Sequence, residues 1–283
     1  MKTILFINLL GLMLICGCLQ NSGENVKNNN EPNQSIIAYL EQEGVSVTNN
    51  ISVDECIKRY DPYDKDTGKK YCNGLKQREE EFLQWLKSAE KNPDMRNERG
   101  RTLLMEINGK PADEKMQIAL TKILLKKGAN PNFTDSTGKT ALMYACDGFA
   151  GDLVFPLPQE RVNLLLQAGA NPNAVDKKGQ TALFYAVHSY QDKIVPLLLK
   201  AGANPNIANS NGFTPLHQAS SWGLTEIVRM LLEAGANPNL KDKEGHTPLW
   251  EIEHHGEINS RSPYVTSEVN SITKLLIDAG AKV

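Results

Sequence analysis

A five-residue phrase that recurs along the chain constrains its fold more than any other feature. Gly-Ala-Asn-Pro-Asn begins at Gly128, Gly169, Gly202 and Gly235, and a truncated copy begins at Gly280. The two central intervals are each 33 residues long. A second phrase, Thr followed by Pro or Ala and then Leu, keeps the same phase and starts at Thr140, Thr181, Thr214 and Thr247. Two motifs that recur in phase indicate repeated structural units, each of which buries its apolar face against its neighbours.

One unit, residues 208–240, predicts two helices followed by a turn. The Thr214 hydroxyl can cap free backbone N–H groups, and the proline after it loses no hydrogen bond at the first helical position. A short inner helix follows, and residues 227–232 give an outer helix with a wide apolar face. Gly235 predicts the left-handed residue that ends this helix, and the next segment is a polar turn of hairpin type.

The period and the sequence of residues 214–219, Thr-Pro-Leu-His-Gln-Ala, resemble the ankyrin repeat. The resemblance implies an all-α fold: an ankyrin-repeat solenoid of five helix-turn-helix repeats with β-hairpin turns. The first, second and fifth repeats are longer, with extra residues between the two helices near 109–116, 149–158 and 257–266. These insertions are either tolerated loop variation or an elaborated contact edge. The expected repeats are 99–133, 134–174, 175–207, 208–240 and 241–283.

The first eighteen residues differ from the rest of the chain. Lys2 precedes an apolar stretch of about a dozen residues, too short to span a bilayer but typical of a secretory signal. Ile15-Cys16-Gly17-Cys18 resembles a bacterial lipobox, although Cys16 departs mildly from it. The resemblance implies a lipoprotein signal peptide over 1–17 and lipidation of Cys18, the alternative being an ordinary cleaved signal peptide. Leu19 after the cysteine implies the outer membrane of a Gram-negative cell, with the protein facing the periplasm.

The residues between the lipobox and the repeats form two segments. Residues 18–34 comprise the lipidated cysteine and an Asn-rich stretch that predicts a flexible tether, because it has too few apolar residues to fold. Residues 35–98 are expected to form an N-terminal capping region. It comprises a helix over 35–43, a small hairpin over 45–53 and a helix over 75–91 that packs on the first repeat.

Cysteine positions suggest one disulfide. Cys56 and Cys72 flank a polar loop, and two such cysteines in an exported protein predict a bond between them. Cys146 is then left single, buried in the second inner helix. The loop between the pair has aspartates at 61, 64 and 66, but Lys69 and Leu75 stand where an EF-hand requires Gly and Glu, so we expect a solvated turn.

No pattern in the chain predicts catalysis. His217 is one helical turn before Ser221, but it is the motif histidine that in ankyrin folds holds the backbone of the neighbouring hairpin. The other histidines, His246, His254 and His255, lack ligands at zinc-binding spacing. A formal net charge of −2 argues against nucleic acid, and no phosphate-binding or hydrolase motif occurs. We therefore expect no enzyme, metal, cofactor or small-molecule substrate, and contact with the membrane only through the lipid anchor.

The resemblance implies that a protein partner docks on the concave face, formed by hairpin tips and inner helices. Tyr190, Phe213 and Trp222 stand out because each is an aromatic that stacking does not need, and aromatics are favoured hot spots. They could equally be scattered exposed aromatics. Tyr190 occupies a position where the family prefers glycine, and Trp250 one where it prefers histidine. The other expected contact residues are His188, Ser189, Ser221, Lys177, Lys178, Asn211, Lys243, His246, His254 and His255.

Location and fold together suggest four functions. Exported ankyrin lipoproteins resemble immunity proteins that protect bacteria from lipase toxins delivered by type VI secretion, so the first expectation is a toxin inhibitor for a phospholipase-type effector. The second is a scaffolding lipoprotein that holds a resident envelope protein or enzyme at the membrane. An enzyme and a host-directed effector are the other two, and the lipobox disfavours the effector.

Overall fold

The computed structural model describes residues 35–43, 77, 80–108, 114–147, 149–150, 153–154, 159–254 and 263–282. The chain divides into two compact units, Met1–Asn130 and Pro131–Val283. The predicted signal peptide, tether, 45–53 hairpin, disulfide pair, aspartate loop and His255 lie outside the described residues. Within the described part of the chain, no helix combines the length and the apolar character needed to cross a membrane.

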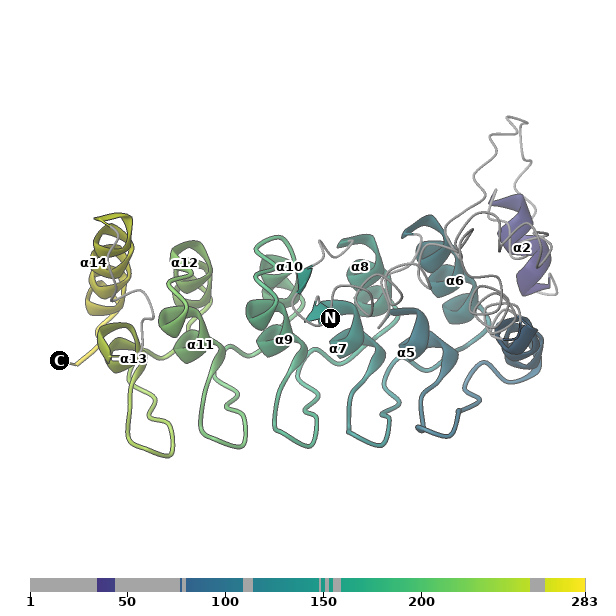
Figure 1. Cartoon of the computed structure of the whole chain (residues 1–283), viewed down its shortest axis with the longest axis horizontal. Coiled ribbons are helices and arrows are strands. Elements are labelled where there is room, and N and C mark those ends of the chain that lie inside the picture. The colour runs from purple at the N-terminus through teal and green to yellow at the C-terminus, as the bar shows by residue number, and fades with distance from the viewer. Residues whose placement is uncertain are drawn as a thin grey trace, which may run out of the picture. The chain divides into compact units, whose positions relative to one another are not determined.

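The first unit contains α2 (Ile36–Gln42), a helix over 80–91, α5 (Leu103–Asn108) and α6 (Glu114–Lys126). Both helices predicted before the repeats are confirmed where they are described. The α2 helix packs beside α6, with Ile36 and Leu40 fully buried (Figure 1). Glu90 ties the two early helices together, because its Oε1 accepts from Ser35 Oγ at 2.7 Å and from the Ile36 N–H at 3.0 Å.

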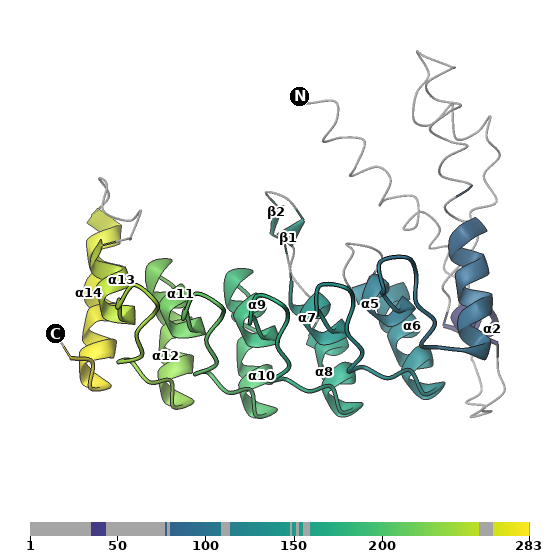
Figure 2. The ribbon, with the colours of Figure 1, turned by 90° about the horizontal axis from the view of Figure 1, so that it is seen from below.

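The second unit is built from four helix pairs that lie side by side. The first helices of the pairs form one row and the second helices form another (Figures 1 and 2). Each helix packs on its partner and on the equivalent helices of neighbouring pairs, so the apolar faces are buried between the rows. The pairs are α7 (Ala141–Cys146) with α8 (Gln159–Gln167), α9 (Ala182–His188) with α10 (Val195–Lys200), α11 (Pro215–Ser221) with α12 (Thr225–Glu233), and α13 (Pro248–His254) with α14 (Pro263–Asp278).

Both predicted helix signals are confirmed. The hydroxyls of Thr140, Thr181 and Thr214 each accept from the backbone N–H three residues later, which caps the inner helices. The glycine that ends each outer helix lies in the left-handed region, for example Gly235 at φ 84°. Cys146 is fully buried in α7, and burial raises the pKa of its thiol. This cysteine therefore serves as a small apolar core residue, as expected.

The second asparagine of each Gly-Ala-Asn-Pro-Asn phrase joins one pair to the next. Asn206 Nδ2 donates to the Gly235 carbonyl at 3.0 Å, and its Oδ1 accepts from the Asn237 N–H at 2.7 Å. The same two bonds recur at Asn132, Asn173 and Asn239. Each amide satisfies one donor and one acceptor on the following pair, so the phrase recurs because it fixes the spacing of neighbours.

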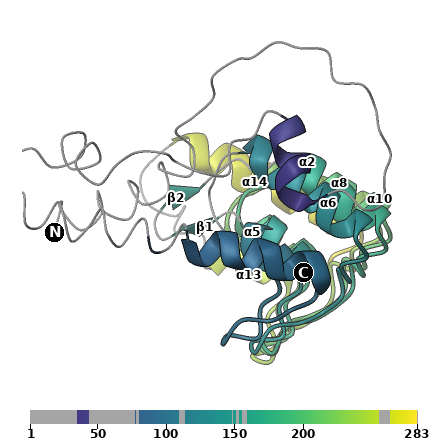
Figure 3. The ribbon, with the colours of Figure 1, turned by 90° about the vertical axis from the view of Figure 1, so that its right-hand side faces the viewer.

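The connecting loops are closed by an Asx side chain instead of by paired strands. In the 135–139 loop, Asp135 Oδ1 accepts from the N–H groups of Thr137 and Lys139, and the Asp135 N–H donates to the Lys139 carbonyl at 3.0 Å. Equivalent loops span 176–180, 209–213 and 242–246. In the end-on view these loops of the second unit project to one side of the helices (Figure 3).

The first, second and fifth repeats were expected to carry their extra residues between their two helices. The helix bounds confirm this for the α7–α8 and α13–α14 connections, which are longer than the α9–α10 and α11–α12 connections, but the α5–α6 connection is shorter than the α9–α10 connection. In the α7–α8 connection, β1 (Phe149–Ala150) and β2 (Leu153–Val154) form an antiparallel ladder that pairs Phe149 with Val154. The ladder stands away from the two helix rows (Figure 2). It provides the only two strands among the described residues.

Candidate protein-binding face

The end of α9 carries an unusual backbone conformation. Tyr190 has φ 54°, and no other non-glycine residue in the described part of the chain has a positive φ. Gly223 takes the same place after α11, nine residues beyond its capping threonine, with φ 68°. Tyr190 therefore occupies a position suited to glycine, as the sequence predicted, and a side chain there costs about 1 kcal/mol or more. Its side chain is nevertheless 45% exposed.

Three rings gather around this point, and we call His188, Tyr190 and Trp222 the aromatic cluster. The Tyr190 and Trp222 rings stack with centroids 5.0 Å apart and planes inclined by 19°. The His188 ring lies on Trp222 at 4.8 Å. Burial lowers the pKa of His188, so its ring is neutral near pH 7 and extends an apolar surface from Trp222. The cluster joins the ends of α9 and α11 into one patch.

A second group of rings runs from the loop before α13 into that helix, and we call His246, Trp250 and His254 the histidine–tryptophan stack. The His246 ring lies flat on Trp250, with centroids 3.4 Å apart and an interplanar angle of 3°. The His254 ring covers Trp250 at 4.4 Å and 8°, and its Nδ1 is 3.0 Å from the Trp250 carbonyl. Sequence reasoning placed both histidines at the contact face but left Trp250 out. The helical spacing of four residues between 246, 250 and 254 was the signal that could have found it.

The charged residues of the loops divide into engaged and solvent-facing groups. Lys139 Nζ pairs with Asp147 Oδ2 at 3.0 Å and lies 4.1 Å from the centre of the Tyr185 ring. Lys177, Lys178, Asn211 and Lys243 are exposed. The three lysines carry positive charge, and the exposed Glu244 that follows Lys243 carries a negative charge.

Ser189, Phe213 and Ser221 are less exposed than their expected role as contact residues requires. Ser189 is fully buried at the end of α9, where its N–H donates to the Tyr185 carbonyl, so its side chain cannot meet a partner. The expectation that Ser189 contacts a partner is therefore wrong, because the residue has no exposed surface. Phe213 is half-buried and packs on His217 at 5.1 Å. Ser221 is half-buried beside Trp222.

His217 has the structural role that the resemblance implied. It is fully buried, its Nδ1 accepts from the Thr214 N–H at 3.2 Å, and its Nε2 is 3.2 Å from the His246 carbonyl. Burial lowers the pKa of His217, which keeps the imidazole neutral. Because both ring nitrogens are engaged with backbone, His217 is not positioned to activate Ser221.

Sequence reasoning missed a degenerate copy of the repeat phrase at Asn92-Pro93-Asp94. Asp94 Oδ1 accepts from the Asn130 N–H at 2.8 Å, the bond that Asn206 makes to Asn237. The Asp94 N–H donates to Asn92 Oδ1, as the second asparagine does in the full phrase. The Asn-Pro pair in front of Asp94 was the available signal. The helix over 80–91 is thus followed by a segment that makes two of the hydrogen bonds of a repeat's phrase, without the left-handed glycine.

Residues 158–242 match a family model for ankyrin repeats (3 copies), and residues 137–177 match one for the ankyrin repeat. The chain therefore contains ankyrin repeats, and these form a protein–protein interaction module. Proteins built from such repeats are generally non-enzymatic interaction scaffolds. No curated protein matches the chain.

Proposed function

We propose that this chain is an envelope lipoprotein whose ankyrin repeats bind and neutralise a secreted antibacterial effector of the phospholipase class. In this proposal Cys18 carries the lipid anchor, residues 19–34 form the tether, and the repeats face the periplasm from the outer membrane. The lipobox-like sequence and the repeat fold support it together, since an anchored inhibitor would meet a membrane-directed toxin at its site of action.

The observation that carries the binding role is Tyr190. Tyr190 lies in the left-handed region, whereas glycine at the equivalent Gly223 meets the same backbone demand at no steric cost. The ring that results is exposed and stacked on Trp222. Strained residues that persist where a relaxed alternative exists cluster at functional sites. We infer that the aromatic cluster is the anchor of the interface.

The exposed lysines of the loops favour a partner surface of opposite charge. Lys177 and Lys178 extend from the loop before α9, and Lys243 from the loop before α13. An effector that docks here would present acidic side chains to these lysines and an apolar group to Trp222. Loss of the rim lysines would slow association, whereas loss of Trp222 would speed dissociation.

Affinity capture tests the proposal. The chain from residue 21 is immobilised and exposed to secreted and envelope extracts of the producing strain, and bound proteins are identified by mass spectrometry. Stoichiometric recovery of a secreted lipase-like protein, lost with Trp222→Ala and retained with Arg229→Ala in the exposed ion pair of α12, supports the proposal. Recovery of resident envelope proteins alone would favour the scaffolding function instead.

A further inference from the structure

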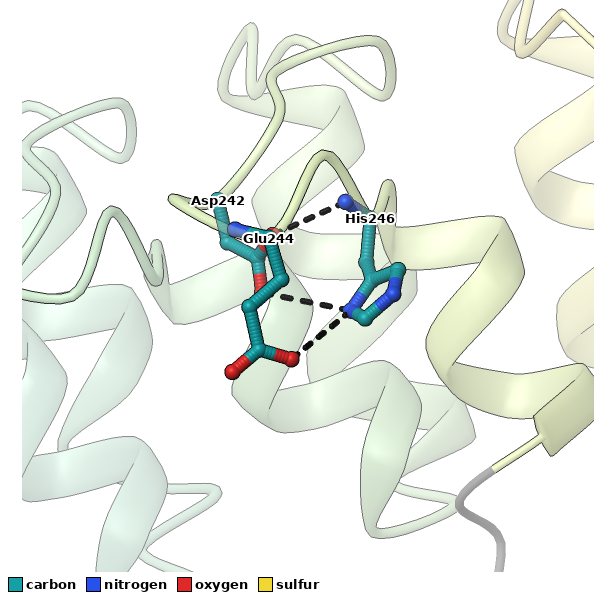
Figure 4. Close-up of side chains that lie close together, drawn as sticks. All are labelled: Asp242, Glu244 and His246. Atoms are coloured by element: carbon teal, nitrogen blue, oxygen red, sulfur yellow. Dashed lines mark hydrogen bonds and ion pairs between the residues drawn. The ribbon is translucent and has the colours of Figure 1, made fainter.

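The last described loop brings together three ligand-bearing side chains that the sequence spacing did not predict as a site. His246 Nδ1 lies 3.6 Å from Asp242 Oδ2 and 3.6 Å from Glu244 Oε2 (Figure 4). One ligand atom from each of the three residues lies within 4.8 Å of the other two. Ligands about 2.1 Å from a tetrahedral zinc ion are about 3.4 Å apart, so the observed spacing needs only small side-chain adjustment.

The loop holds two of these groups in place. Asp242 Oδ1 accepts from the N–H groups of Glu244 and His246, which leaves Oδ2 as the atom turned toward the imidazole. The His246 ring is fixed from one side by the Trp250 indole at 3.4 Å. The His246 carbonyl accepts from the Asp242 N–H and lies 3.2 Å from His217 Nε2. Only the exposed Glu244 side chain must be immobilised when an ion binds.

Among the described loops of the second unit, only this one combines an aspartate, a glutamate and a histidine at these positions. The other described loops of the second unit have the same backbone hydrogen bonds but carry Thr137 and Lys139, Lys178 and Gln180, or Asn211 and Phe213 at the two later positions. In two of them, the oxygen equivalent to Asp242 Oδ2 accepts from a tyrosine hydroxyl, at 2.6 Å in Asp135 and 2.7 Å in Asp176. Position 251, nine residues after Asp242, is a glutamate, so no such hydroxyl takes this oxygen.

We propose that Asp242, Glu244 and His246 form a binding site for a divalent transition-metal ion such as Zn²⁺. Two carboxylate oxygens and one imidazole nitrogen suit zinc, cobalt or nickel, whereas calcium and magnesium prefer oxygen ligands alone. The two carboxylates neutralise the ion's charge. Three protein ligands leave a coordination position open to water or to a carboxylate or imidazole of another molecule. Ion binding by these three side chains does not depend on the proposed effector binding, although the loop also carries Lys243 of the proposed interface.

Titration of the full-length protein with ZnCl₂ in a calorimeter tests the site. We expect one ion per chain, with affinity lowered about 10-fold to 100-fold in His246→Ala and in Glu244→Gln. Glu244→Gln is the decisive variant, because this side chain is 77% exposed and its loss cannot unfold the repeat. Glu233→Gln, which removes an exposed carboxylate of α12, is the matched control and should bind zinc normally.

Trp250 provides an independent readout. The chain has three tryptophans, and with Trp85 and Trp222 replaced by Phe only Trp250 fluoresces. Because His246 stacks on this indole, Ni²⁺ bound to the loop should quench its emission, and Glu244→Gln should abolish that quenching. Absence of zinc binding, or zinc affinity and Ni²⁺ quenching unchanged in both loop variants, would overturn the proposal.

Discussion

The Tyr190 ring stacks on the Trp222 indole with centroids 5.0 Å apart, although the Tyr190 backbone has a φ of 54°. Two successive repeats are thereby joined on their exposed side by a contact that helix stacking does not require. The same backbone position after α11 is Gly223. The strain at Tyr190 and its contact with Trp222 can be separated by mutation.

Replacement of Tyr190 should separate the energetic effect of the backbone strain from that of the ring stacking. Tyr190→Gly relieves the left-handed strain but loses the stacking, and both effects are about 1 kcal/mol, so we expect a free energy of unfolding within about 1 kcal/mol of the wild type. Tyr190→Ala loses the stacking and keeps the strain, so it should be about 1 kcal/mol less stable than Tyr190→Gly. Urea denaturation measures both. Equal stability of the two variants would show that the backbone at this position is not strained.

The close approach of neighbouring loops gives a second prediction. Gly212 has φ 82°, and a Cβ there would lie 2.8 Å from the Asp242 Cα, whereas Gly235 has φ 84° and nothing within 4 Å of such a Cβ. Gly235→Ala should therefore cost only the left-handed strain, about 1 to 2 kcal/mol. Gly212→Ala should cost about 1 to 3 kcal/mol more, because the backbones must separate. Similar urea midpoints for the two variants would contradict the loop contact.

Asp135 should make the protein sensitive to acid. Burial by itself raises the pKa of Asp135, but hydrogen bonds from Tyr144, Thr137 and Lys139 outweigh it and lower the pKa to about 2. The carboxylate thus stabilises the folded state above pH 3.8, and this contribution is lost as the pH falls through 2. We expect a loss of about 1 to 2 kcal/mol, allowing for solvent screening.

Asp135→Asn should remove this part of the acid sensitivity. Asn209 makes the same two loop hydrogen bonds with a neutral amide, so the loop tolerates the change. Urea midpoints at pH 5 and pH 2.5 compare the two proteins, and the wild type should lose more stability than the variant over this interval. An equal loss in both would mean that Asp135 does not contribute to acid unfolding.

His217 should behave as a structural histidine. His217→Ala removes its bonds to the Thr214 N–H and the His246 carbonyl and leaves a cavity, which should cost about 2 to 4 kcal/mol. Because burial lowers the pKa of His217 below the ordinary 6.5, wild-type stability should fall as the pH drops below 6.5, where the unfolded chain takes up the proton. Urea denaturation at pH 7.5 and 5.5 measures this loss of stability, with His188→Gln present in both proteins. The stability of His217→Ala should change less between the two pH values than that of the protein with His217.

The local signals of the fold could be predicted from the sequence because they are short-range. The Thr214 cap, the Gly235 stop and the His217 contact each follow from a residue's own backbone and its motif. The binding face was less predictable. Burial of Ser189 depends on tertiary packing at the end of α9, and the stack of His246, Trp250 and His254 depends on side-chain orientation.

The Asp242, Glu244 and His246 cluster was missed for a related reason. These three residues are not adjacent histidines and do not have the spacing of a known zinc motif. The loop instead brings alternate residues to one side, because Asp242 Oδ1 binds the two N–H groups that follow it. The copy of the repeat phrase at Asn92-Pro93-Asp94 was hidden because Glu90 and Lys91 replace Gly-Ala and Asp94 replaces the second Asn, although Asp94 preserves the acceptor oxygen.

If the aromatic cluster anchors a secreted effector, as we propose, an affinity measurement tests this role most directly. The effector recovered by capture is titrated against wild type, Trp222→Ala and Arg229→Ala, with folding checked by circular dichroism. We predict that Trp222→Ala weakens the Kd by about 30-fold or more, equivalent to about 2 kcal/mol, while Arg229→Ala leaves it unchanged. Unchanged affinity in a folded Trp222→Ala variant, or loss of affinity with Arg229→Ala instead, would contradict the claim.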